Sequence, residues 1–362
     1  MTSWDEAENV LCVRLDSLGD VLMTTPALRA LKDSNPRRRL TLLTSPSGAA
    51  VAALIPEVDG VITYEAPWMK IARPDVERDR ELIDLLAARR FDAAIIFTVA
   101  TQSALPAALI CYLAGIPLRA AYCRENPYHL LTDRLPERDL SAQHEVERQL
   151  ALAASLGYCT ENEFLSLAIP DAARIEAEEA LRATGLDEER PWVLIHPGAS
   201  APSRRYPPLL FAAAADLAAE ELGWSVVFSG SAGEQGLVEE IRGRMTAPSL
   251  SVAGALELPA FAAVVEAAPL LISNNTGPVH IAAAVGTPVV DIYALTNLQH
   301  APWRVPHRLL THDVPCRGCL KSVCPVQGHP CLSGISPREV VDAAADLMRE
   351  SRPEGRRLHA AV

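Results

Sequence analysis

The stretch that decides the fold class lies near the start of the chain, where residues 10–34 read VLCVRLDSLGDVLMTTPALRALKDS. Its first six residues form a short apolar run typical of a buried strand, and a helical pattern follows within a few residues. Similar apolar runs recur at 40–43, 61–64, 93–97, 192–195, 225–229, 270–273 and 289–293. Longer helical stretches separate these runs. The alternation predicts an α/β fold with two parallel-sheet units.

The length of 362 residues suits about two domains at roughly 150 residues each. We expect an N-terminal Rossmann-like domain over 1–170, a C-terminal one over 190–350, and a flexible tail over 351–362. Ligands of such sheets bind beyond the carboxyl ends of the strands. Two domains facing a central cleft would therefore place the active site in that cleft.

Composition narrows the functional classes. Hydrophobic residues make up 49% and charged residues 22%, which is a globular balance. The net charge of −12 argues against nonspecific nucleic-acid binding, so an anionic ligand would have to be held by local groups. The sequence shows neither a signal-peptide pattern nor an uninterrupted run of about 18 apolar residues. We therefore expect a cytoplasmic protein.

The first motif runs from the first predicted strand into a helix, over residues 14–26. Gly19 permits a close approach of the backbone to a ligand. Asp20 falls in the first turn of the helix, where a carboxylate either interacts with the helix dipole or acts as a general base. Spacing alone favours the dipole role, because acidic residues are common in first turns.

Two further motifs follow strands of the second series. HPGASAPSRRYPP, residues 196–208, places Arg204 and Arg205 on a loop, where they either bind phosphate oxygens or are simply solvated. NNTGPVH, residues 274–280, begins a helix whose free N–H groups suit an anion, unless Asn275 or Thr276 caps them. His280 is either a ligand contact or a core histidine.

Together and in this order, the three motifs resemble glycosyltransferase family 9, the ADP-heptose:lipopolysaccharide heptosyltransferases of GT-B fold. The resemblance rests on R-x-D-x-x-G-D-x-x-x-x-T-P at 14–26, on HPGAS with the downstream Arg204, and on N-T-G-P-x-H at 275–280. It implies an inverting, metal-independent sugar transfer, with the donor held mainly by the C-terminal domain and the acceptor by the N-terminal one. Asp20 resembles the catalytic base of the family.

The resemblance also assigns a donor site. The residues expected there are Gly19, Arg204, Glu234, Asn275, Thr276, Gly277 and His280. Arg204 takes the place of the diphosphate contact, and Glu234 that of the acidic contact to the nucleoside, although a glutamate at a helix start is also ordinary. Where the family usually has aspartate, this chain has Asn275. An amide caps a helix as aspartate does, and it can also donate to a sugar oxygen.

Two other segments are candidates for binding. Apolar and basic residues alternate in the segment that contains Trp68, Lys70 and Arg73. The segment is either an acceptor-binding edge that faces a phospholipid surface or a loop that merely packs one tryptophan. The loop 315–332 contains Cys316, Cys319, Cys324 and Cys331 in a C-x2-C-x4-C-x6-C spacing. These four thiols either form a structural zinc site or remain as reduced thiols or labile disulfides.

The sequence and the resemblance therefore predict a glycosyltransferase that moves a sugar from a nucleotide diphosphate sugar to a lipopolysaccharide-core-like or other glycan acceptor. Heptose is the sugar that the resemblance favours. No cofactor is expected for catalysis, and contact with the cytoplasmic face of the inner membrane is compatible with such an acceptor. Two alternatives remain at this stage. One is a GT-B transferase or epimerase for another nucleotide sugar, and the other is a non-catalytic nucleotide-sugar-binding module with a zinc loop.

Overall fold

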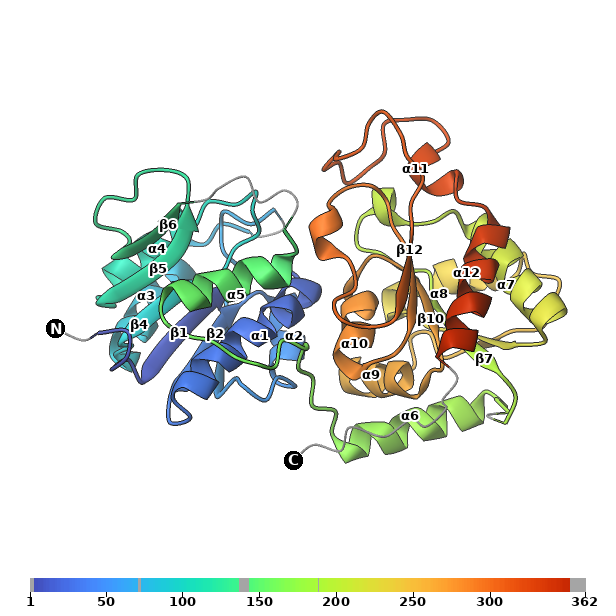
Figure 1. Cartoon of the computed structure of the whole chain (residues 1–362), viewed down its shortest axis with the longest axis horizontal. Helices are drawn as coiled ribbons and strands as arrows, with labels where there is room; N and C mark the ends of the chain where they lie inside the picture. The colour runs from blue at the N-terminus through green and yellow to red at the C-terminus, as the bar shows by residue number, and fades with distance from the viewer. Residues whose placement is uncertain (1–2, 71–72, 137–142, 188, 352–362) are drawn as a thin grey trace. The chain divides into compact units, whose positions relative to one another are not determined.

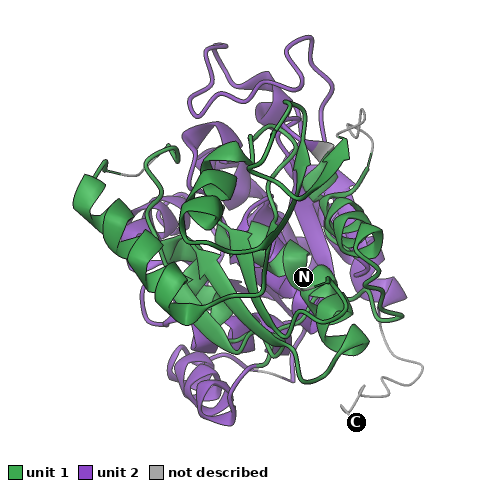
Figure 2. Ribbon diagram, turned by 90° about the vertical axis from the view of Figure 1, so that its left-hand side faces the viewer, with its two compact units in different colours: residues 1–168, 298–303 green, residues 169–297, 304–362 purple. Residues whose placement is uncertain are grey.

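The computed structural model describes residues 3–70, 73–136, 143–187 and 189–351. The chain divides into two compact units (Figure 2). The first contains residues 1–168 and 298–303, and the second contains residues 169–297 and 304–362. Apart from Ser351, the tail expected over 351–362 lies outside the described residues.

The first unit is built on a six-stranded parallel sheet. Its strands are β1 (Asn9–Arg14), β2 (Arg39–Thr44), β3 (Gly60–Thr63), β4 (Ala93–Ile96), β5 (Leu118–Cys123) and β6 (Asp133–Pro136), in the order β3-β2-β1-β4-β5-β6. The four strands predicted in this region are confirmed. The sequence pattern missed β5 and β6, because β5 contains an arginine and two alanines, and β6 is short, polar and only partly buried.

The helices of the first unit are α1 (Leu18–Ser34), α2 (Pro46–Ala52), α3 (Val76–Arg89), α4 (Leu105–Leu113) and α5 (Glu145–Ser155) (Figure 1). Side chains alternate between the two faces of a strand. In β1, Leu11 and Val13 pack with residues of α3 and α4 in one apolar cluster. Arg14 therefore points to the opposite face, where α1 and α5 pack against each other.

The second unit repeats this plan. Its strands are β7 (Trp192–His196), β8 (Ser225–Phe228), β9 (Leu250–Ser251), β10 (Leu271–Asn274), β11 (Val289–Ile292) and β12 (His307–Leu310), in the order β12-β11-β10-β7-β8-β9. Its helices are α6 (Asp171–Ala183), α7 (Pro208–Leu222), α8 (Gln235–Arg242), α9 (Leu258–Ala267), α10 (Gly277–Val285), α11 (Pro330–Ser333) and α12 (Pro337–Glu350). All four strands predicted here are confirmed, whereas β9 and β12 were missed.

Both sheets have the strand order of a Rossmann fold. Counted along each unit, the order is 3-2-1-4-5-6, with every pair parallel. The predicted α/β class with two Rossmann-like units is therefore confirmed. In such sheets the chain reverses direction across the sheet between strands 1 and 4, and ligands bind beyond the carboxyl ends of the strands there. Those ends are the loops after β1 and β4 in the first unit, and after β7 and β10 in the second.

One short segment belongs to a different unit from the residues on either side of it in the sequence. Residues 298–303, which include the 3₁₀ turn η3 (Leu298–His300), belong to the first unit, although the sequence placed them within the C-terminal domain. His144 donates from Nε2 to the Ala301 carbonyl at 2.9 Å, and its ring stacks on Trp303. Trp303 in turn donates to the Glu163 carbonyl at 2.6 Å. These contacts are made over a long sequence separation, so no local pattern could reveal them.

Over the residues that the structure describes, no helix is both long enough and apolar enough to span a membrane.

Candidate active site

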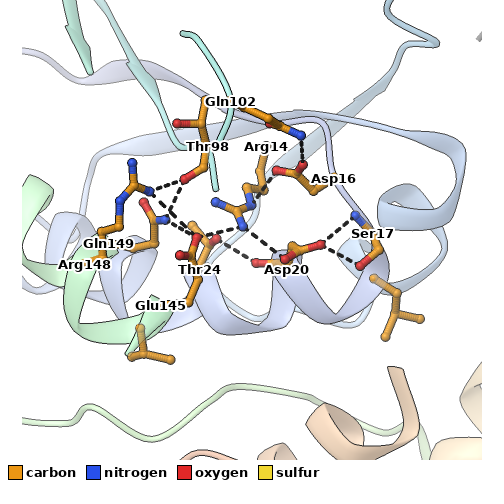
Figure 3. Close-up of polar contacts among 12 residues, drawn as sticks. Arg14, Asp16, Ser17, Asp20, Thr24, Thr98, Gln102, Glu145, Arg148 and Gln149 are labelled. Carbon is orange, nitrogen blue, oxygen red and sulfur yellow. Dashed lines mark hydrogen bonds and ion pairs between the residues drawn. The ribbon is translucent and has the colours of Figure 1, made fainter. Parts of the chain in front are cut away.

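Asp20 lies where the sequence placed it, in the first turn of α1. The helix begins after Ser17, and Asp20 Oδ2 accepts hydrogen bonds from the Ser17 backbone N at 3.0 Å and from Ser17 Oγ at 2.6 Å (Figure 3). This arrangement is half of a capping box, so the structural role of Asp20 at the helix start is real. It uses one carboxylate oxygen and leaves Oδ1 for other contacts.

The other oxygen of Asp20 meets a buried arginine. Arg14, fully buried at the end of β1, places Nη2 3.2 Å from Asp20 Oδ1 and 2.9 Å from Glu145 Oε1, while its Nε lies 3.1 Å from Asp16 Oδ2 (Figure 3). One guanidinium thus faces three carboxylates. A buried charge is tolerated only when it is paired and hydrogen-bonded, and here the cation is paired three times.

These contacts separate the acidities of two nearby carboxyls. Burial alone would raise the pKa of Asp20, but Arg14, His300 and the hydrogen bonds from Ser17 lower it to about 2. Asp16 is also buried. Desolvation and the charge of Asp20 raise its pKa to about 6, although Arg14 lowers it. Asp20 is therefore ionised at neutral pH. It keeps 9% of its surface exposed.

Helix α5 supplies the part of this network that the sequence analysis missed. Glu145, Arg148 and Gln149 are completely buried. Gln149 Nε2 donates to Glu145 Oε1 at 2.5 Å and to the Thr98 carbonyl at 3.1 Å, and Arg148 donates to the same carbonyl (Figure 3). The three residues share one helix face through i, i+3 and i+4 spacing, and that polar stripe was the available signal.

The predicted acceptor segment lies close to this network. Trp68 and Met69 line a small cavity with Thr98 and Gln102. Gln102 Nε2 donates to Asp16 Oδ1 at 2.6 Å. The Trp68 ring makes an edge contact with Tyr64, with 5.9 Å between centroids, yet 36% of the residue stays exposed.

Lys70 and Arg73 complete that segment, and both are exposed. The two residues between them, 71 and 72, are outside the described part of the chain. The structure thus brings Trp68 to the carboxyl edge of the first sheet and gives it a packing partner as well.

The second unit positions its predicted site through two consecutive asparagines. Asn274, at the end of β10, accepts from the Tyr206 backbone N at 2.9 Å and donates to the Pro197 carbonyl at 2.8 Å, which ties this turn to the loop after β7. Asn275 donates from Nδ2 to Asp291 Oδ2 at 2.7 Å, which ties the turn to β11. The sequence analysis missed both Asn274 and Asp291.

Helix α10 begins directly after this turn. Thr276 is its N-cap residue, but its side chain makes no capping bond and instead donates to the Asn274 carbonyl at 3.2 Å. Thr276 and Gly277 are half-buried, whereas His280 is buried one turn into the helix. Pro278 has no N–H, and Val279 donates to the Thr276 carbonyl at 3.0 Å. The Gly277 N–H is therefore the first-turn donor that the Thr276 side chain leaves to an anion.

Arg204 is exposed on the 3₁₀ turn η1 (Pro202–Arg204), next to a buried serine. Ser203 donates from its backbone N to the Ser322 carbonyl at 3.1 Å and from Oγ to the Lys321 carbonyl at 2.6 Å. The cysteine-rich loop therefore holds the segment that carries Arg204. Arg205 is tied back to its own loop through the Ala199 carbonyl.

Glu234 closes a capping box, since its Oε2 accepts from the Ser231 backbone N at 2.9 Å and from Ser231 Oγ at 2.8 Å. The same oxygen lies 3.7 Å from His196 Nε2. Burial raises the pKa of Glu234, but His196 and Ser231 outweigh it and lower the pKa overall. A Cβ at Gly198 would come within 2.0 Å of Glu234 Oε1, so a larger residue there would displace this carboxylate.

The predicted donor residues thus fall into two groups. Arg204, Glu234 and residues 275–280 lie in the second unit, on the segments that follow β7, β8 and β10, with residues 277–280 in the first turn of α10. Gly19 lies in the first unit, buried beside Asp20.

The four clustered cysteines line one cavity of about 40 Å³, together with His329 and Ser203. Burial and the three neighbouring thiols raise the pKa of Cys331. Among the described residues, no set of three or more His, Cys, Asp or Glu side chains is arranged to hold a metal ion. The four thiols therefore line one cavity, while the zinc site stays a prediction.

Comparison with known proteins decides the family. The model of the family described as glycosyltransferase family 9 (heptosyltransferase) matches residues 80–329. The chain belongs to glycosyltransferase family 9. Its two Rossmann-like units are those of the GT-B fold, and the protein is a glycosyltransferase.

Similar proteins span nearly the whole chain of this family 9 enzyme. Lipopolysaccharide heptosyltransferase 2 of Salmonella typhimurium is 27% identical over 359 residues, covering 94% of this chain and 99% of the relative. A family 9 glycosyltransferase from Veillonella parvula superposes with a TM-score of 0.81 at 23% identity, covering 97% and 99% of the two chains. ADP-heptose lipopolysaccharide heptosyltransferase II of Escherichia coli superposes with a TM-score of 0.74 at 23% identity, covering 94% and 99%.

Proposed function

We propose that this family 9 enzyme transfers heptose from ADP-heptose to a lipopolysaccharide-core-like acceptor with inversion at the anomeric carbon. The observation that carries the proposal is Asp20, an ionised and slightly exposed carboxylate fixed by Arg14 and Ser17 at the carboxyl edge of the first sheet. The names of the relatives support heptose and lipopolysaccharide as substrates.

In the proposed reaction, an acceptor hydroxyl oxygen attacks the anomeric carbon while the bond from that carbon to the diphosphate breaks. Asp20 takes the hydroxyl proton, and the diphosphate leaves with the electron pair. Negative charge then grows on the leaving group, where fixed donors lower the barrier most. Arg204 and the N–H groups at the start of α10 are the donors that we assign to this role.

The acceptor is proposed to bind along Trp68, Lys70 and Arg73. The exposed basic residues suit phosphate groups on a glycolipid, and the half-exposed tryptophan suits the face of a sugar ring or the edge of a lipid surface. Under this proposal, the enzyme works at the cytoplasmic face of the inner membrane without spanning it.

The test is a transfer assay with purified protein, ADP-heptose or UDP-glucose as donor, and a lipopolysaccharide core truncated before its heptoses or after the first heptose as acceptor. Release of ADP only when acceptor is present supports the proposal. Isomerisation of the donor without acceptor would indicate an epimerase instead. Tight ADP-heptose binding without turnover on either acceptor would indicate a binding module.

We further propose that Cys316, Cys319, Cys324 and Cys331 hold a structural zinc ion. Four thiols around one cavity are the right donor set, and the ion would supply order to a loop that is poor in apolar residues. That loop contacts Ser203, so its order bears on Arg204. Elemental analysis of protein purified without chelator tests this. About one zinc per chain is expected, and less than about one-tenth of an equivalent would reject the site.

A further inference from the structure

The turn that starts α10 is fixed by a pair of side chains, and one of them, Asp291, lies outside the motifs that identify the family. Asn275 precedes the N-cap residue of α10, and its Nδ2 donates to Asp291 Oδ2 at 2.7 Å. Both side chains are buried, and Asp291 is completely so. Removing one partner of a buried hydrogen bond is costly, because the other polar group is then left buried without a hydrogen bond.

Asp291 reaches the turn because of its position in the sheet. It pairs with Ser273 in the register between β10 and β11, and its neighbours Val290 and Ile292 point into the opposite, apolar face. Alternation therefore directs the Asp291 side chain to the face that carries α10. The bond to Asn275 links the middle of β11 to the residue just after the end of β10.

Within the described part of the chain, the Asp291 carboxyl has no second hydrogen-bond partner that would explain its burial. Its Oδ1 is buried without a hydrogen bond among the described residues. A lone carboxyl in such a place is costly, and an apolar residue would cost less if only packing were required. The bond to the Asn275 amide is thus the contact for which this position needs a polar side chain.

We propose that Asp291 is a positioning residue for the donor site, because it holds Asn275 and thereby sets the start of α10 where the diphosphate binds. Asn274 fixes the same turn to the loop of Arg204 from the other side. The inference rests on the proposed donor site. If the inference is right, nucleotide binding requires a hydrogen-bond acceptor at position 291, or a reversed pair with the amide at 291 and the carboxylate at 275.

The experiment compares three variants by ADP and UDP titration calorimetry at pH 7. Asp291→Val keeps a strand-forming side chain but removes the acceptor, so ADP affinity should fall about tenfold or more. Asp291→Asn keeps an acceptor oxygen, and the double variant Asn275→Asp with Asp291→Asn reverses the pair. Both should bind ADP within about threefold of wild type, because the hydrogen bond is retained.

A matched control separates positioning from stability. Thr287 is buried in the same unit and donates to the Val265 carbonyl at 2.7 Å, away from the turn. Thr287→Val should lower the melting temperature yet leave ADP affinity unchanged. The Michaelis constant for the acceptor should be unchanged in all four variants.

Two results would overturn the inference: a folded Asp291→Val variant that binds ADP within about threefold of wild type, or an Asp291→Asn variant as weak as Asp291→Val. Failure of the wild-type protein to bind either ADP or UDP is a different outcome, because it would refute the proposed donor site itself.

Discussion

Replacing Asp20 with asparagine tests the catalytic assignment most directly. The variant keeps the size of the side chain and an oxygen that can accept from Ser17, but it loses the negative charge. Turnover should fall by about 10²-fold or more, the usual contribution of a positioned base. ADP affinity should not change, because Arg204 and the α10 start lie in the other unit.

The structure also sets the expected loss of stability. The pKa of Asp20 is lowered from 3.8 to about 2, so its ionised form stabilises the fold by about 2 kcal/mol at neutral pH. That contribution is present above the unfolded pKa and is lost as the pH falls through 2. Arg14 keeps Glu145 and Asp16 as partners, so Asp20→Asn should cost no more than about 2 kcal/mol.

A control separates the capping role from the chemical one. Ser17→Ala removes a donor to Asp20 Oδ2 but leaves the carboxylate in place. It should lower the melting temperature with a loss of about 0.5–2 kcal/mol while turnover stays within a few-fold of wild type. Thermal melting and a steady-state assay on the same preparations measure both quantities. Near-normal kcat in folded Asp20→Asn protein would refute the assignment of Asp20 as the base.

Three further predictions follow from the charges and hydrogen bonds described above. Arg204→Ala should reduce kcat/KM by roughly 2–4 kcal/mol of transition-state stabilisation, and Ser203→Ala should reduce it by less, as steady-state kinetics with varied donor would show. Glu145→Gln removes one anion from Arg14 but keeps an acceptor oxygen, so it should lower kcat while leaving the acceptor KM unchanged; an unchanged kcat would limit Glu145 to packing. Burial raises the pKa of Asp291 to about 8, whereas the same carboxyl in the unfolded chain releases its proton near pH 4. The folded protein therefore loses stability relative to the unfolded chain as the pH rises from about 4 towards 8. Asp291→Asn should therefore gain up to about 5 kcal/mol relative to wild type between pH 4 and pH 9 in melting experiments, and a constant difference would contradict the raised pKa.

The sequence by itself determined the class of fold and the location of the motifs. Eight strands were recognisable as short apolar runs, and all of them except β3 are mostly buried. Parallel strands that are covered on both faces are apolar along their length. Asp20 could be placed in a first turn, and residues 275–277 at a helix start, because a strand end and a helix start are defined within a few residues. The strands that were missed, such as β6 and β9, are short and only partly buried, so their sequences carry no such run.

Tertiary structure alone decided which groups surround those motifs. Arg14 and Glu145 are 131 residues apart yet form one buried ion pair. Asn275 meets Asp291 on the next strand, so the amide that departs from the family pattern has a partner inside the protein. Ser203 reaches across 118 residues to the cysteine-rich loop. Hydrophobic periodicity records which face of an element is buried, but a polar contact depends on strand order and register, and these are set only when the whole sheet assembles.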